Sequence, residues 1–131
     1  MSADNRTGFE SEMRRLDRSG FPKAIHFIDP DEELLARVKN GVLVIVAGWS
    51  GAAKLAFGVL SEATSEFLTR GVSMYVIDHD ELDGKAAERV LGTLPQGWGE
   101  TYWVRDGRIV HSLSRYDQSA MQAIKNFTAT L

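Results

Sequence analysis

The chain contains no cysteine, and this absence excludes more chemistry than any other feature of its composition. Without a thiol, no disulfide forms, no thiolate attacks a substrate, and no cysteine holds a metal ion. The three histidines, His26, His79 and His111, do not show the i, i+4 spacing of two metal ligands on one helix. We therefore expect no resident metal and no cofactor.

Long runs of one residue class are also absent. No cluster of Lys or Arg marks a nucleic-acid or membrane-surface site, and the net charge is −3. The longest apolar run, Val42–Ala47, is too short to cross a bilayer. The N-terminal residues "MSADNRTGFESEMRR" are polar and unlike a secretory signal. These features predict a cytoplasmic protein that binds no nucleic acid and does not insert into a membrane.

Apolar residues and turn signals predict an alternation of strands and helices within one domain of 131 residues. Strands are expected over 23–28, 42–47, 72–78, 100–105 and 108–114. Helices are expected over 9–18, 29–40, 50–69, 83–94 and 117–131, with residues 1–8 disordered. Alternating elements bring strands parallel, and Asp106-Gly107 predicts a final hairpin. The fold class is therefore α/β, with a mixed central sheet between helices in the order β-α-β-α-β-α-β-β-α.

Capping residues and apolar spacing set the details of these helices. Asp29, Ser50 and Asp117 are each expected to cap the helix that follows. The helix after Ser50 is expected to bury one apolar side against the core. This side is formed by Leu55, Val59, Leu60, Ala63 and Phe67. The first helix places Phe9, Met13 and Leu16 on one side. We interpret it as a cover for part of the core, and a docking helix for a partner is the alternative.

Two segments carry a resemblance to a known family. The stretch "VLVIVAGWSGAAK", the hairpin "YWVRDGRIV" and the element order together resemble thioredoxin over residues 23–131. Residues 1–22 remain as an N-terminal extension with a short helix. Thioredoxins carry Trp-Cys-Gly-Pro-Cys-Lys where this chain has Trp49, Ser50, Gly51, Ala52, Ala53 and Lys54. The resemblance implies a thioredoxin-like, three-layer α/β/α fold.

The two cysteine positions of that motif hold Ser50 and Ala53. A helix N-terminus stabilises a nearby anion by only about 0.3–1 kcal/mol at an exposed site, which is less than one pKa unit. Ser50 therefore stays a neutral alcohol, and Ala53 has no group that resolves a mixed disulfide. We expect no catalytic residue, and the turn is interpreted as a vestigial active site.

Other residues that support thioredoxin chemistry are missing as well. The resemblance places the family's buried aspartate at Val44 and its neighbouring lysine at Met74. The family's cis-proline falls at Gly99, or at Glu100 if one residue is deleted. Laboratory replacement of two cysteines would not explain these further differences. The pattern indicates a naturally redox-inactive member of the family, and therefore not an enzyme.

The same face is expected to bind a protein. The resemblance places Trp49 and Trp98 beside the vestigial turn, with Gly99 and Glu100 in the neighbouring loop, and exposed tryptophans are frequent binding hot spots. An acidic segment near them holds Asp80, Glu81 and Asp83, and it suits a basic peptide. The expected partner is a protein client or a signal peptide, with a homodimer as a variant.

Redox-inactive bacterial proteins that resemble thioredoxin act as chaperones in [NiFe]-hydrogenase maturation. They hold the small subunit before its twin-arginine export. The length near 130 residues, the acidic composition and the lost cysteine pair fit this group. Two alternatives belong to other classes. One is a glutathione-binding or Ser50-dependent enzyme with Glu100 as its base, and the other is a structural subunit attached through the N-terminal helix.

Overall fold

The computed structural model describes residues 3–131, with side chains from Thr7 onward. Its helices are α1 (Ala3–Leu16), α2 (Leu34–Val38), α3 (Gly51–Leu68), α4 (Gly84–Leu91) and α5 (Ala120–Thr128), with short 3-10 turns η1 (Pro22–Ala24) and η2 (His79–Glu81). Its strands are β1 (Ile25–Phe27), β2 (Gly41–Val46), β3 (Ser73–Asp78), β4 (Trp98–Arg105) and β5 (Arg108–Leu113). No helix in this range is long and apolar enough to cross a membrane.

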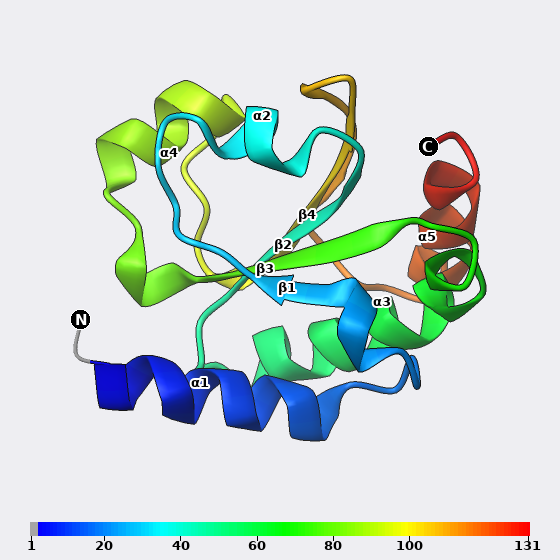
Figure 1. Ribbon diagram of the computed structural model, residues 1–131, viewed down its shortest axis with the longest axis horizontal. Coiled ribbons are helices and arrows are strands. Elements are labelled where there is room, and N and C mark those ends of the chain that lie inside the picture. The colour runs from blue at the N-terminus through cyan, green and yellow to red at the C-terminus, as the bar shows by residue number, and fades with distance from the viewer. Residues whose placement is uncertain (1–2) are drawn as a thin grey trace.

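The five strands form one mixed sheet in the order β1-β3-β2-β4-β5. β1 and β2 run parallel to β3, whereas β4 pairs antiparallel with both β2 and β5. Helices α1, α3 and α5 cover one face, and α2 and α4 cover the other (Figure 1). Alternate residues of β2 enter the two cores: Val42, Val44 and Val46 face α3, while Leu43 and Ile45 face α2 and α4. The expected three-layer α/β/α fold with a mixed sheet is confirmed.

Helix α1 is longer than predicted. The expectation that residues 1–8 are disordered is wrong for residues 3–8, which belong to α1, whereas residues 1 and 2 lie outside the described range. Met13 is fully buried and Phe9 nearly so, in the same core as α3. Once these two side chains fix the second half of the helix, propagation toward the N-terminus adds one hydrogen bond per residue without a new nucleus.

Two helices begin later than their capping residues predict. Asp29 does not cap α2, which begins at Leu34 after a turn in which the Asp31 carboxylate accepts the Glu33 N–H at 2.9 Å. Asp117 likewise accepts the Ser119 N–H at 2.9 Å, and α5 begins at Ala120. Asp side chains favour local turns of this kind as well as helix caps, and at these two positions the turn forms.

The buried stripe of α3 also differs from the expected one. Leu55 is 63% exposed, while Ala53, Ala56, Phe57 and Leu60 are buried. The helix carries apolar residues on more than one side. Spacing alone therefore does not determine which of two adjacent rows of side chains faces the core. Helix α3 packs against β2 and β4 of the sheet and against α1 and α5, and these neighbours select the buried row.

Candidate functional site

The candidate site lies where β2 ends and α3 begins. Ser50 has extended backbone angles, and its Oγ accepts the Ala53 N–H at 3.2 Å, as the sequence predicts for an N-cap. The Ser50 N–H in turn donates to the Ala47 carbonyl oxygen at 3.0 Å. The hydroxyl oxygen thus serves as the helix cap, and no hydrogen bond joins it to a histidine within residues 7–131. The turn is a well-formed helix start.

The rest of the turn divides between surface and core. Gly51 and Ala52 are exposed, whereas Ala53 is fully buried. The Lys54 ammonium is 3.0 Å from the Glu12 carboxylate, so this lysine ties α3 to α1. The two positions that hold cysteine in the thioredoxin motif thus face different surroundings, Ser50 at the surface edge and Ala53 in the core.

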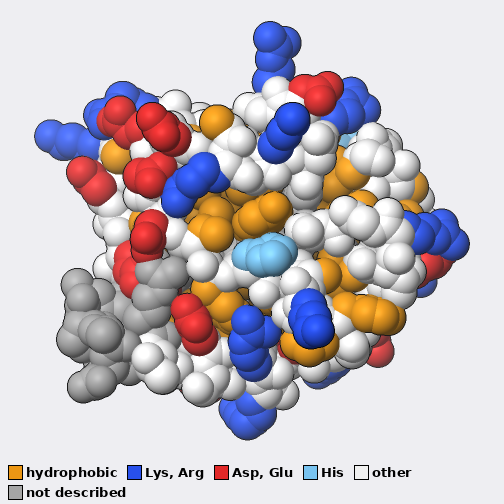
Figure 2. Space-filling model, viewed as in Figure 1, with side chains coloured by type: hydrophobic (Ala, Val, Ile, Leu, Met, Phe, Trp, Pro, Cys, Tyr) orange, Lys and Arg blue, Asp and Glu red, His pale blue; other side chains and the backbone are white. Residues whose placement is uncertain are grey.

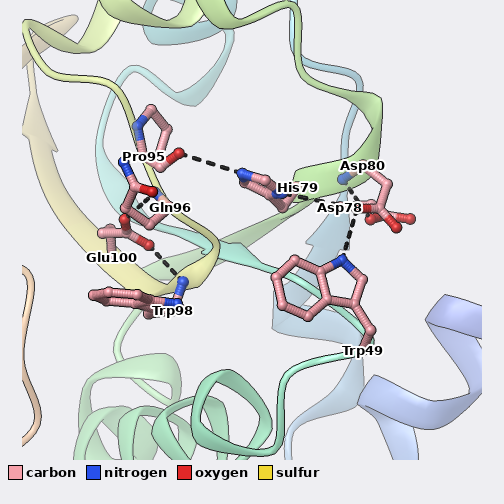
Figure 3. Close-up of polar contacts among 8 residues, drawn as sticks. All are labelled: Trp49, Asp78, His79, Asp80, Pro95, Gln96, Trp98 and Glu100. Carbon is pink, nitrogen blue, oxygen red and sulfur yellow. Dashed lines mark hydrogen bonds and ion pairs between the residues drawn. The ribbon is translucent and has the colours of Figure 1, made fainter.

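Trp49 stands out from this turn with 65% of its surface exposed. Its ring N–H donates to Asp80 Oδ1 at 3.0 Å, and its ring meets His79 edge-on with centroids 6.3 Å apart (Figure 3). The other side of the His79 ring is held at Nε2, which lies 3.3 Å from the Pro95 carbonyl oxygen. Trp49 is therefore exposed and also held in a defined orientation.

The acidic segment beside Trp49 uses its carboxylates mainly for local structure. Asp78 caps η2 by accepting the Asp80 N–H at 3.0 Å, and Asp83 caps α4 by accepting the Lys85 N–H at 3.1 Å. Asp80 and Asp83 are exposed, and Glu81 is half-buried. Their charges still present one acidic edge next to the Trp49 indole.

The second tryptophan lies across the start of α3. Trp98 begins β4, is 57% exposed, and lines a hollow of about 300 Å³ together with Ala52, Leu55 and Ala56. We call the exposed apolar side chains Trp49, Ala52, Leu55 and Trp98 the tryptophan face. Exposed apolar clusters of this kind mark interaction sites in soluble proteins. Leu55 belongs to this face because it lies on the exposed side of α3, although the apolar spacing predicts it on the inward side.

Gly99 is the residue of β4 that faces the turn. It has φ +93°, and a Cβ built on it would lie 2.7 Å from the Ala56 Cβ and 3.6 Å from the Ala53 carbonyl oxygen. The ladder between β2 and β4 shifts register here, so that Ile45 pairs with Glu100 and Val46 with Trp98. Gly99 thus lies opposite Ala53. No peptide bond of residues 3–131 is cis.

Glu100 points away from the surface. It is 8% exposed, and its carboxylate accepts the backbone N–H of Trp98 at 2.8 Å and that of Gln96 (Figure 3). No hydrogen bond joins it to Ser50. Its side chain is thus placed to hold the 96–98 loop, so a part for Glu100 in binding would be through this loop.

Two phenols lie near the Glu100 charge. Burial raises the pKa of Tyr116 most, and the nearby Glu100 carboxylate raises it further, although a hydrogen bond with Thr101 acts in the opposite direction. The pKa of Tyr102 is raised for the same two reasons, against a hydrogen bond with Thr93. Both hydroxyls therefore remain protonated near neutral pH and act as hydrogen-bonding groups.

Comparison with known proteins finds no match among protein-family models and none among curated proteins. Solved structures do match. Thioredoxin from Malassezia sympodialis has a TM-score of 0.61 at 19% identity, covering 79% of this chain and 90% of that one. Oxidised thioredoxin from Plasmodium falciparum has a TM-score of 0.61 at 16% identity, covering 79% and 98%.

Thioredoxin O1 from Arabidopsis thaliana has a TM-score of 0.59 at 17% identity, covering 82% of this chain and 96% of that one. At such low identity the likeness extends to backbone architecture and not to activity. The expected resemblance is therefore confirmed at the level of the fold. The chain has the thioredoxin-like fold, with Ser50 and Ala53 at the turn where the motif has cysteines.

Proposed function

We propose that this chain is a non-catalytic protein-binding module that holds a client polypeptide against the tryptophan face, as a chaperone or assembly factor does. The observation that carries the proposal is the exposure of three large apolar side chains, Trp49, Leu55 and Trp98, around one helix start. A soluble protein that leaves such residues uncovered has a reason to bind an apolar partner there. Because the chain has no thiol, the bond to the partner is non-covalent.

The absence of thiol chemistry is tested by an insulin-reduction assay with dithiothreitol as the electron donor. We expect the rate to equal the rate with dithiothreitol alone, because neither Ser50 nor Ala53 can exchange with a disulfide. A rate above that baseline would contradict the proposal.

The binding face is tested with partners captured from the native host and identified by mass spectrometry. Each partner is then purified, and its dissociation constant is measured with wild type, Trp49→Ala, Trp98→Ala and Phe21→Ala. Phe21 is the matched control because it is also an exposed aromatic residue, 40% exposed, and lies away from the turn near η1. Loss of a central aromatic anchor is expected to weaken binding by about 2 kcal/mol or more. Equal affinity of all four proteins would exclude the tryptophan face.

For the client we propose a hydrogenase small subunit held before twin-arginine export. The acidic edge beside Trp49 supports this choice, since a basic segment of a signal peptide would lie against Asp80, Glu81 and Asp83 while an apolar segment meets the indole. The test compares a synthetic twin-arginine signal peptide with a variant in which both arginines are glutamine. Equal binding of the two peptides would exclude this client, but it would not contradict the proposal that the chain is a protein-binding module.

The acidic edge is examined with Asp80→Asn, Glu81→Gln and Asp83→Asn combined. These changes remove charge but keep hydrogen-bond acceptors for the Trp49 ring and the α4 cap. We expect weaker binding of the basic peptide and a smaller dependence on salt. The control, Glu62→Gln with Glu66→Gln, removes exposed charges from α3 and should leave affinity unchanged.

A further inference from the structure

The buried carboxylate of Glu100 has an unusual set of partners. It is 8% exposed, and among residues 7–131 it forms no ion pair with Lys or Arg. Its two oxygens instead accept two backbone N–H groups, Oε1 that of Trp98 at 2.8 Å and Oε2 that of Gln96. Charged acceptors form stronger hydrogen bonds than neutral ones, and a buried carboxylate needs such partners to stay buried. The charge of Glu100 is therefore committed to the loop that carries Trp98.

This loop has little intrinsic rigidity. Gly97 and Gly99 on either side of Trp98 both have positive φ, at +86° and +93°. A chain with glycine at such positions loses much conformational freedom when it becomes ordered. Trp98 pairs with Val46 at the end of the β2–β4 ladder, where the register shifts. Its own side chain, which is largely in solvent, adds little to this hold.

The strand side of the loop is held independently of Glu100. The Thr101 hydroxyl donates to the Gly99 carbonyl oxygen at 2.8 Å and also contacts the Tyr116 hydroxyl. On the other side, the Gly97 carbonyl oxygen accepts the Ala47 N–H at 2.8 Å. Between these two hydrogen-bonded carbonyl groups, the Trp98 N–H donates to the buried Glu100 side chain.

We propose that Glu100 is a positioning residue, which fixes the backbone of residues 96–98 and so aims the Trp98 indole onto the tryptophan face. Its link to partner binding rests on the proposed function, whereas its effect on Trp98 does not. Glu100→Gln tests it with little change in shape. Glutamine puts an NH₂ group where one carboxylate oxygen accepts an N–H, so two donors would face each other and one loop amide would lose its acceptor.

The readout is fluorine NMR of protein labelled with 5-fluorotryptophan, which gives one signal each for Trp49, Trp98 and Trp103. In Glu100→Gln we expect the Trp98 signal to shift or split while the buried Trp103 signal stays. The control is Thr128→Val, which removes the buried acceptor of the Trp103 ring N–H. It should move the Trp103 signal and leave Trp98 unchanged, so general loss of stability is separated from loop positioning.

Amide hydrogen exchange provides the second measurement. In the wild type the Gln96 and Trp98 amides should be protected, and in Glu100→Gln at least one should exchange about tenfold faster or more, as loss of a charge-assisted hydrogen bond implies. An unmoved Trp98 signal with unchanged exchange would overturn the proposal. If Glu100→Gln does not fold, unprotected Gln96 and Trp98 amides in the wild type would overturn it equally.

Binding of a captured partner separates this proposal from the proposed function. If Glu100→Gln moves Trp98 and weakens partner binding as much as Trp98→Ala does, the positioning role and the binding face are both supported. If Trp98 moves and affinity does not change, the positioning role stands and the place of Trp98 in partner binding fails. If Trp98 stays in place while Trp98→Ala still weakens binding, the positioning role fails and the binding face stands.

Discussion

The close approach of Gly99 to α3 leads to a quantitative prediction for Gly99→Ala. The new methyl group would lie 2.7 Å from the Ala56 Cβ, which is shorter than real Cβ contacts, and the backbone at φ +93° strains any residue with a Cβ. The strain is about 1–2 kcal/mol for an L-residue in the left-handed region. Overpacking adds about 1–3 kcal/mol. We expect the free energy of unfolding to fall by about 2–5 kcal/mol in total.

The two contributions are separable with a double-mutant cycle. Ala56→Gly removes the methyl group that Gly99→Ala would meet, and by itself it costs about 1 kcal/mol of helix propensity. In the double variant the overpacking disappears and only the backbone strain remains. The two changes should therefore be non-additive by about 1–3 kcal/mol, in the direction that Ala56→Gly rescues Gly99→Ala.

Urea denaturation followed by circular dichroism measures all four proteins. Gly51→Ala serves as a control in the same turn, because a Cβ there has no neighbour within 4 Å, and it should leave stability unchanged or slightly raised. Additive effects of Gly99→Ala and Ala56→Gly would refute the contact between the loop and α3. A cost below about 0.5 kcal/mol for Gly99→Ala alone would refute the strain as well.

Three further changes test other parts of the structure. Ser50→Ala removes the acceptor of the Ala53 N–H and should cost about 1 kcal/mol in urea denaturation. Met13→Ala empties a fully buried position and should cost about 2–5 kcal/mol, and a negligible cost would contradict the place of α1 in the core. Burial raises the folded-state pKa of Tyr116, so the unfolded chain releases this proton at lower pH than the folded protein does. The free energy of unfolding is therefore unaffected by this group below about pH 10. Above that pH it should fall by about 1.4 kcal/mol per pH unit for this group. Tyr116→Phe should remove that part of the alkaline loss in denaturation curves recorded above and below this pH.

Local signals in the sequence predicted most of the architecture. The Asp106-Gly107 pair forms the hairpin between β4 and β5, with both residues at positive φ. Ser50 caps α3, and the apolar run before it forms a strand buried on both faces. Each of these features depends on residues close together in the chain, where backbone preferences and short hydrogen bonds decide the conformation.

The starts of α2 and α5 could not be predicted in the same way. Asp31 accepts the Glu33 N–H and is also paired with Arg37 at 3.0 Å, so the residues expected to form the first helical turn form a tighter turn before α2. Asp117 and Ser119 repeat this arrangement before α5. Asp favours both a cap and a turn, and only the docking of the following apolar residues selects between them.

The surroundings of Trp98 were beyond sequence reasoning for a different reason. In a regular strand, Trp98 and Glu100 would lie on the same face because side chains alternate with period two. The register shift opposite Ile45 and Val46, with Gly99 at positive φ, breaks this alternation. The aromatic residue then faces solvent while the carboxylate turns inward. A bulge of this kind depends on the partner strand, which the sequence of β4 alone does not contain.

The chemistry of this turn has consequences for how a partner is held. Without a thiol the proposed partner cannot be trapped as a mixed disulfide, so its residence time would depend on non-covalent contacts. The Trp49 indole is oriented by Asp80, and the backbone of Trp98 is held by Glu100, so less freedom remains to be lost when the proposed partner binds. Preorganised anchors raise affinity mainly by reducing this entropic cost. If the proposed binding face is correct, we therefore expect the residues that hold the tryptophans to affect affinity without contacting the partner.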